Sequence, residues 1–259
     1  FLGASTLNSY YLQPALFPEE VAHTFNLVNS IPLDKPVLIA GDFDAGFAGE
    51  IRLTSQSIIE HLIRRDLNIA IMAINPVDAA LLTDQINKGL SSVPSYSSAN
   101  KMVDLGYLPG GAIAVQNMGN SFVEAVPLTA EMVKVTANEI TKNVQNLRDF
   151  GAIIVITDKS ENARVWIEQI QPTLGDTPLL MVTSAQASPL ILPYYQSGQV
   201  DGLVSGMAGG MIYEQILGSS SGAGRNAASL QLLSVLMAFL VLIGGFTSLV
   251  NPKSGWRKR

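Results

Sequence analysis

Short, fully apolar runs alternate along the chain with longer segments in which apolar residues recur every three or four positions. A run of four to six apolar residues between polar turns is typical of a strand that is buried on both faces. Apolar residues at helical spacing predict helices that bury one face. The runs that predict strands are residues 37–40, 69–74, 152–157, 179–183 and 202–205.

Helical patterns lie before, between and after these runs. A helix should begin at Pro18-Glu19-Glu20, because proline fits the first helical turn and acidic side chains are favourable there. Further helices are predicted over residues 51–65, 77–88, 160–171 and 188–196, and a short one after residue 205.

A polar stretch follows the predicted helix over residues 77–88, and residues 107–111 show neither helical nor strand periodicity. The pattern then predicts one long amphipathic helix that Thr129 is placed to cap. The apolar side chains that define this helix are Met132, Val135, Ile140, Val144 and Leu147.

Strands that are separated by helices need crossover connections, which produce a mostly parallel sheet covered on both faces. We therefore predict an α/β domain over residues 19–218, with a doubly wound, Rossmann-like sheet of about five strands. The pattern does not fix the order of the strands.

One apolar run is much longer than the others. Residues 230–250 read LQLLSVLMAFLVLIGGFTSLV and carry no charge. As a helix this run would be roughly 31 Å long, which matches the hydrocarbon core of a bilayer. A flexible Gly/Ser-rich tether, residues 219–229, precedes it, and a short tail with Trp256 and a basic cluster, residues 251–259, follows. We expect one C-terminal transmembrane helix.

The distribution of charge gives this helix a direction. Four basic residues and no acid follow Val250, whereas residues 1–218 carry an excess of ten acidic charges. Basic residues beside a span favour the cytoplasmic side. We expect the tail in the cytoplasm, the α/β domain outside it at the cell membrane, and residues 1–18 as an extracytoplasmic lead-in after a missing upstream segment, because the chain begins with Phe1.

Composition narrows the chemistry. The sequence has no cysteine, which excludes a disulfide framework and a thiolate metal site, and only two histidines, His23 and His61. Its net charge of −5 argues against a nucleic-acid partner. A divalent cation is the only candidate cofactor, with Asp42 and Asp44 as its candidate ligands.

Polar residues follow the predicted strands, where ligands bind in folds of this class. They suggest a crevice, the candidate ligand-binding site, which the Tyr107 turn would join. Its members are Asp42, Asp44, Asp158, Lys159, Ser184 and Tyr107.

Several interpretations compete for these loops. The motif Asp42-x-Asp44 resembles the opening motif of haloacid-dehalogenase-like phosphatases, but Lys159 precedes Ser184, which reverses the order of that family. The glycines from Asp44 to Gly49 resemble a dinucleotide fingerprint with Asp in place of the first Gly, where a carboxylate would repel a pyrophosphate.

A serine hydrolase lacks support, because Ser205 is not in a G-x-S-x-G motif and both histidines fall on predicted helices. The remaining interpretation is structural. Asp44 and Asp158 would cap the helices that follow them, and the glycines would permit a tight turn.

The chain resembles a group of uncharacterised bacterial membrane-anchored α/β proteins. The segments that carry this resemblance are residues 41–50, 106–111 and 199–206. The resemblance implies the anchored architecture and no established activity.

We therefore expect an accessory or interaction subunit of a membrane protein assembly rather than an enzyme. Its transmembrane helix would pack against other membrane subunits through Gly244 and Ser248, because small residues allow close helix packing in lipid. The alternative is a metal-assisted hydrolase or small-ligand binder that uses the crevice at Asp42 and Asp44.

Overall fold

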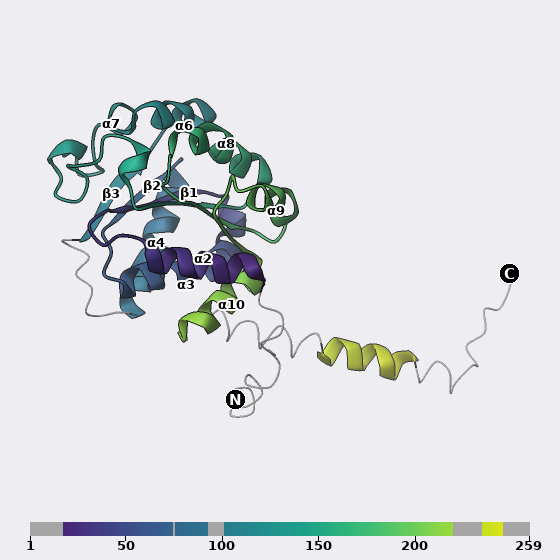
Figure 1. The fold of residues 1–259 in the computed structure, drawn as a ribbon. Coiled ribbons are helices and arrows are strands. Elements are labelled where there is room, and N and C mark those ends of the chain that lie inside the picture. Colours follow the sequence, from purple (N-terminus) through teal and green to yellow (C-terminus); the bar gives the residue numbers. More distant parts are fainter. Residues whose placement is uncertain (1–17, 75, 93–100, 220–234, 246–259) are drawn as a thin grey trace. The chain divides into compact units, whose positions relative to one another are not determined.

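A computed structural model shows a six-stranded parallel sheet between two layers of helices (Figure 1). The structure describes residues 18–74, 76–92, 101–219 and 235–245. The α/β body belongs to one compact unit, Pro14–Ala223.

The strand order is β3-β2-β1-β4-β5-β6, and every neighbouring pair is parallel. From β1 the chain builds outward through β2 to β3, then returns to the centre and builds the other half from β4. This order confirms the Rossmann-like α/β prediction, with six strands where about five were expected. The strands are β1 (Val37–Asp42), β2 (Ile69–Ala73), β3 (Met102–Tyr107), β4 (Ala152–Thr157), β5 (Leu179–Thr183) and β6 (Gly202–Ser205).

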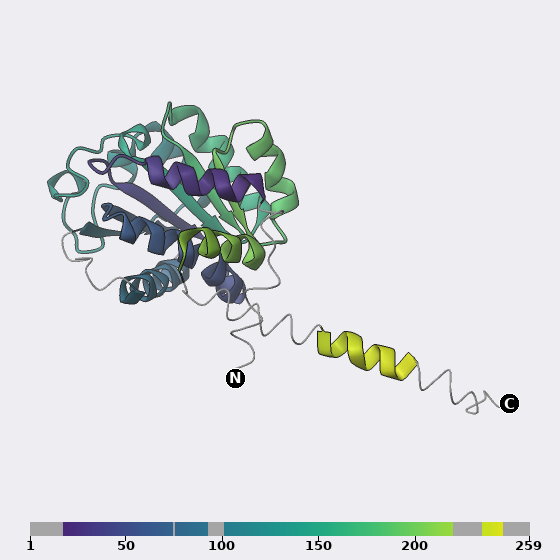
Figure 2. The same cartoon turned by 60° about the horizontal axis from the view of Figure 1, so that its bottom comes forward.

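Two sets of helices cover the two faces of the sheet (Figures 1 and 2). One set is α2 (Glu19–Ser30), α3 (Ala48–Arg64), α4 (Pro76–Ser92) and α10 (Gly206–Leu217). The other is α6 (Gly111–Asn120), α7 (Phe122–Ala125), α8 (Ser160–Ile170) and α9 (Ser188–Gln196). Short 3-10 turns lie at Ala45–Phe47, Val135–Ala137, Leu147–Asp149 and Gln171–Thr173.

Successive residues of β1 supply two separate cores. Leu38 and Ala40 pack with α6 and α8, whereas Val37 and Ile39 pack with α2, α3 and α4. Since successive side chains of a strand point to opposite faces, a strand at the centre of a two-sided sheet must be apolar throughout. The unbroken apolar runs of the sequence have this cause.

The predicted long helix between residues 129 and 147 is wrong. Thr129 and Val133 instead form a hairpin, in which the Thr129 N–H donates to the Val133 carbonyl at 2.8 Å. Met132 lies at its tip with φ of 63°, a left-handed conformation that no helix interior contains. Further along, the Asn138 side chain accepts a hydrogen bond from the Ile140 N–H at 2.9 Å, which competes with helical pairing.

Three of the five apolar residues that defined this segment are buried, whereas Met132 is 74% exposed and Ile140 is only partly buried. Val135, Val144 and Leu147 are 0%, 1% and 1% exposed and pack on the α6 and α8 side of the sheet. Each of these side chains is buried by a separate turn. Their helical spacing in the sequence therefore marks buried positions but no helix.

The structure also describes part of the predicted membrane segment. Residues 235–245 are helical. Within the described part of the chain, no helix combines the length and the apolar character that a membrane crossing requires. The remainder of residues 230–250, Ser248 among them, and the tail lie outside the described residues.

Candidate functional site

The two halves of the sheet meet at β1 and β4, and the polar loops after these two strands form the candidate site. Asp42, the last residue of β1, is in register with Thr157, the last residue of β4. From this edge the chain leaves β1 toward α3 on one face and β4 toward α8 on the other. In open α/β sheets the crevice at such a switch point is the usual place for a ligand.

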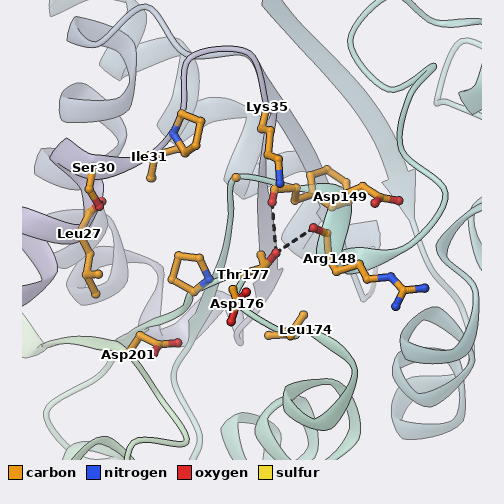
Figure 3. A pocket seen from close by; sticks show the side chains of 15 residues that line it. Leu27, Ser30, Ile31, Lys35, Arg148, Asp149, Leu174, Asp176, Thr177 and Asp201 are labelled. Atoms are coloured by element: carbon orange, nitrogen blue, oxygen red, sulfur yellow. Dashed lines mark hydrogen bonds between the residues drawn. The ribbon is translucent and has the colours of Figure 1, made fainter.

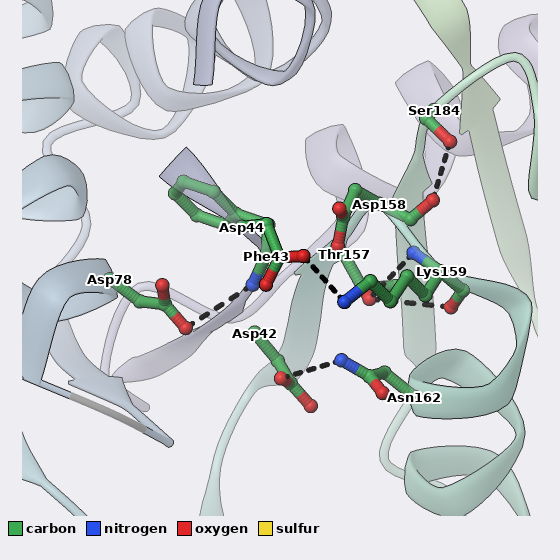
Figure 4. A network of polar contacts seen from close by, with 9 residues as sticks. All are labelled: Asp42, Phe43, Asp44, Asp78, Thr157, Asp158, Lys159, Asn162 and Ser184. Carbon is green, nitrogen blue, oxygen red and sulfur yellow. Dashed lines mark hydrogen bonds and ion pairs between the residues drawn. The ribbon is translucent and has the colours of Figure 1, made fainter. Parts of the chain in front are cut away.

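Asp42 holds α8 against β1. Its Oδ2 accepts a hydrogen bond from Trp166 Nε1 at 3.0 Å. Figure 4 shows the second bond, which its Oδ1 accepts from Asn162 Nδ2 at 2.9 Å. Burial raises the pKa of Asp42, while the Trp166 bond counteracts the shift and the nearby Asp158 adds to it. Because both oxygens already have protein donors, the carboxylate acts as a fixed acceptor inside the fold.

Asp44 and Lys159 join the two loops at the surface. Asp44 Oδ2 and Lys159 Nζ are 2.5 Å apart, and both side chains are largely exposed, at 61% and 40%. The hydrogen bond to Asp44 raises the pKa of Lys159, with Asp158 and Asp42 adding to the shift. An exposed pair of this kind contributes little stability, so it opens at small cost.

Asp158 differs from both other carboxylates. It is 0% exposed, and neither carboxylate oxygen has a hydrogen-bond partner among the described residues. Burial raises its pKa; backbone N–H groups of Asp44 and Asp158 itself oppose the shift without reaching hydrogen-bond geometry, and Asp44 adds to it. A buried acceptor left unsatisfied costs about 1–3 kcal/mol, which makes such groups rare in folded proteins.

The main chain around Asp158 is firmly held. Ser184 Oγ donates a 2.6 Å hydrogen bond to the Asp158 carbonyl, and the Ser184 N–H donates to the Thr157 carbonyl at 3.3 Å. On the other loop the Phe43 N–H donates to Asp78 Oδ2 at 3.3 Å (Figure 4). The position of the Asp158 carboxylate is therefore set by β4 and its neighbours.

The sequence predicted much of this cluster. The structure brings Asp42, Asp44, Asp158 and Lys159 together, and Ser184 supports them through the backbone. Tyr107 does not share this position: it ends β3, which β2 separates from β1, and is 50% exposed.

Two partners at the site were missed. Asn162 and Trp166 lie four residues apart on α8, a spacing that places them on one helix face, and both reach Asp42. This spacing on the helix that follows β4 was the signal that could have identified them.

The capping interpretation of the acids is not what the structure shows. Asp44 precedes the 3-10 turn at Ala45–Phe47 without a capping hydrogen bond, and the Asp158 carboxylate, without a partner among the described residues, does not cap α8. Glu50 reaches across instead and accepts a 2.7 Å hydrogen bond from the Ala185 N–H. A Cβ at Gly46 or Gly49 would meet no atom within 4 Å, so neither glycine is required by a close neighbour.

His61 is a packing residue. Its ring stacks on Phe25 with the centroids 4.6 Å apart, and its nitrogens face Tyr213 Oη at 2.8 Å and Asn29 Oδ1 at 3.1 Å. Burial, with Arg65 and Arg64 nearby, lowers the pKa of His61 to about 4. The neutral ring thus donates to Asn29 and accepts from Tyr213, a role within the fold.

A second concavity lies at the opposite edge of the sheet, before the strands begin. It has a volume of about 600 Å³, and Lys35, Arg148 and Asp176 are among its lining residues (Figure 3). Thr177 closes its floor by donating to the Arg148 and Phe150 carbonyls at 3.0 and 3.3 Å. None of the sequence-predicted site residues lines this cavity.

Asp42 and Asp44 are not arranged as ligands around a common metal position. Their carboxylates have separate partners, and within the described ranges no group of three or more histidine or acidic residues is arranged to hold a metal ion. Comparisons of the chain with protein-family models, curated proteins and solved structures found no match.

Proposed function

We propose that the chain is a membrane-anchored α/β domain that acts as an accessory or interaction subunit of a membrane protein assembly. Residues 230–250 would be its anchor, and the basic tail would place the α/β domain outside the cytoplasm. The observation that carries the binding role is the double hydrogen bond on Asp42. Its carboxylate, the first acid of the phosphatase-like motif, is held by Trp166 and Asn162 as part of the fold.

The other polar groups at the crevice support the same proposal. Lys159 is paired with Asp44, and Ser184 donates to the Asp158 carbonyl. A serine hydroxyl needs a base within hydrogen-bond reach to act as a nucleophile. Both oxygens of Asp42 and the hydroxyl of Ser184 have structural partners instead.

The proposed anchor would dock on a neighbouring membrane helix through Gly244 and Ser248. These small residues are four positions apart, a spacing that lets helix backbones approach closely. The Gly/Ser-rich tether would then leave the acidic domain free to lie over the partner.

A cross-linking experiment on the full chain tests this role. Cells that carry the tagged chain are treated with a cross-linker, their membranes are solubilised in mild detergent, and the adducts are identified. Gly244→Leu with Ser248→Leu should remove the membrane-protein adducts, while Gly245→Leu, which adds similar bulk beside that face, should retain them. Adducts that are unchanged in the double variant, or a chain without adducts, would contradict the proposal.

A second candidate function is binding of a small ligand at the crevice. It is favoured by one observation, the buried carboxylate of Asp158 without a hydrogen-bond partner.

A further inference from the structure

The charge around Asp158 is unbalanced. Asp158 interacts electrostatically with Asp42 and with Asp44, and Lys159 is a cation that acts on Asp42 and Asp158. That same lysine is already bonded to Asp44. Three carboxylates therefore face one ammonium group, and the most buried of the three has no hydrogen-bond partner among the residues that the structure describes.

The Asp158 carboxylate is held in a position where it can accept a hydrogen bond from a ligand. The Asp158 backbone is fixed by Ser184, and its carboxylate points into the space that Asp44 and Lys159 also enter (Figure 4). The exposed Asp44–Lys159 pair lies beside it and opens at small cost. A partner for Asp158 must offer hydrogen-bond donors, positive charge and small size.

We propose that the crevice binds the protonated amino group of a small ligand, with Asp158 as its principal acceptor and Asp44 as the second. An ammonium group offers three N–H donors and a full positive charge, which are what the orphaned carboxylate lacks. On binding, the ligand ammonium replaces Lys159 at Asp44 and donates to Asp158.

A divalent metal ion fits the same residues less well. It needs six or more oxygen ligands in a defined shell. Both oxygens of Asp42 already accept hydrogen bonds from Trp166 and Asn162, and no group of acids within the described residues is arranged around a common centre. An amine needs only Asp158, whose oxygens have no partner among the described residues, and Asp44, whose exposed pair with Lys159 opens at small cost.

This inference rests on the second candidate function and names its ligand class. It is independent of the membrane role, since loss of amine binding would leave the cross-linked partners unchanged. Lys159 acts here as an internal competitor. Its removal should therefore strengthen amine binding, an effect that a purely structural cluster would not show.

Thermal unfolding of the full chain in mild detergent tests the proposal. The probes are methylammonium and putrescine, with tetramethylammonium as a cation of equal charge without N–H donors, Mg²⁺ as the metal, and sodium chloride to match ionic strength. In the unaltered chain the two amines should raise Tm in a saturable way, whereas tetramethylammonium and Mg²⁺ should not.

Variants locate the effect. Asp158→Asn should abolish the amine-dependent shift, and Lys159→Met should lower the amine concentration that gives half of it. Asp66→Asn, at an acid paired with Lys101 away from the crevice, is the control that should bind normally.

Three results would overturn the proposal: no shift with either amine, an equal shift in the Asp158→Asn variant, or a shift produced by Mg²⁺ in their place. If Asp158→Asn fails to fold, isothermal titration of the Lys159→Met variant with putrescine decides, because amine binding no tighter than in the unaltered chain would also overturn it.

Discussion

Trp166 Nε1 donates a 3.0 Å hydrogen bond to Asp42 Oδ2, and this bond joins α8 to the end of β1 at the centre of the sheet. Trp166 is 0% exposed, so the bond lies inside the core although Asp42 belongs to the crevice. A residue that the sequence suggested for chemistry is thus part of the framework that positions Asp158 beside it.

Trp166→Phe removes the donor and keeps an aromatic ring in the core. Hydrogen bonds to charged acceptors contribute about 1.5–3 kcal/mol, so the free energy of unfolding should fall by about 2 kcal/mol, including the smaller ring. Urea unfolding followed by circular dichroism measures this. A loss below about 0.5 kcal/mol would show that the bond does not hold α8 to β1.

Asp158→Asn should change how stability depends on pH in the absence of any amine. Because the folded pKa of Asp158 is raised above its ordinary value of 3.8, the folded state binds the proton more tightly than the unfolded state. The stability that Asp158 contributes is fully present below pH 3.8 and is lost as pH rises through its raised pKa. The variant should gain stability relative to the original chain as pH rises above 3.8 and through the raised value, as measured by urea unfolding. A difference that is constant over this range would show that Asp158 does not titrate as described.

His61→Gln should remove a pH dependence of stability whose sign is opposite to that of Asp158. The folded pKa of His61, about 4, lies below its ordinary value of 6.5, so the unfolded state binds the proton more tightly. Stability from this group is present above 6.5 and is lost as pH falls toward 4. The difference between original and variant should fall by on the order of 2 kcal/mol across this window, allowing for some solvent screening. Parallel pH profiles of the two proteins would contradict the buried, neutral ring.

Gly210 marks the close approach of α10 to α3. A Cβ there would lie 2.6 Å from the Leu53 carbonyl oxygen and 2.7 Å from Thr54 Cα, both backbone atoms that cannot move aside. Gly210→Ala should cost about 1–3 kcal/mol in free energy of unfolding. The neighbouring Gly209→Ala is the matched control. Its Cβ would come no closer than 3.3 Å to any neighbour, the nearest being a Val204 methyl, so it should cost less than about 1 kcal/mol. Equal losses of unfolding free energy in the two variants would show that the close α3–α10 contact does not cause the destabilisation.

The central strands could be predicted because their sequence has a single explanation. Val37 to Ala40 and Ile153 to Ile156 are 0–1% exposed, so each run had to be apolar on both faces. The edge strand β3 was missed because its exposure alternates and it contains Asp104 and Gly106, residues that strands usually avoid. Helix α6 was missed because its N-cap, Gly110, and its first residue, Gly111, are both glycines of the turn after β3.

The candidate site was predictable in its members and not in their partners. Asp42 and Asp158 follow apolar runs, and parallel strands bring such residues to one edge of a sheet. Their different roles depend on contacts between distant segments: Asp42 accepts a hydrogen bond from Trp166, 124 positions away, and Asp158 has no hydrogen-bond partner in the described part of the chain. No local pattern encodes that difference.

The most direct test of the proposed anchored domain is protease digestion of intact spheroplasts from a bacterial host that carries the full chain. Protease added outside should digest residues 1–218 while the membrane keeps the fragment that contains residues 230–259. The basic residues after Val250 predict this side for the α/β domain. Protection of the domain in spheroplasts with digestion only in inverted vesicles, or recovery of the intact chain apart from the membrane, would contradict the account.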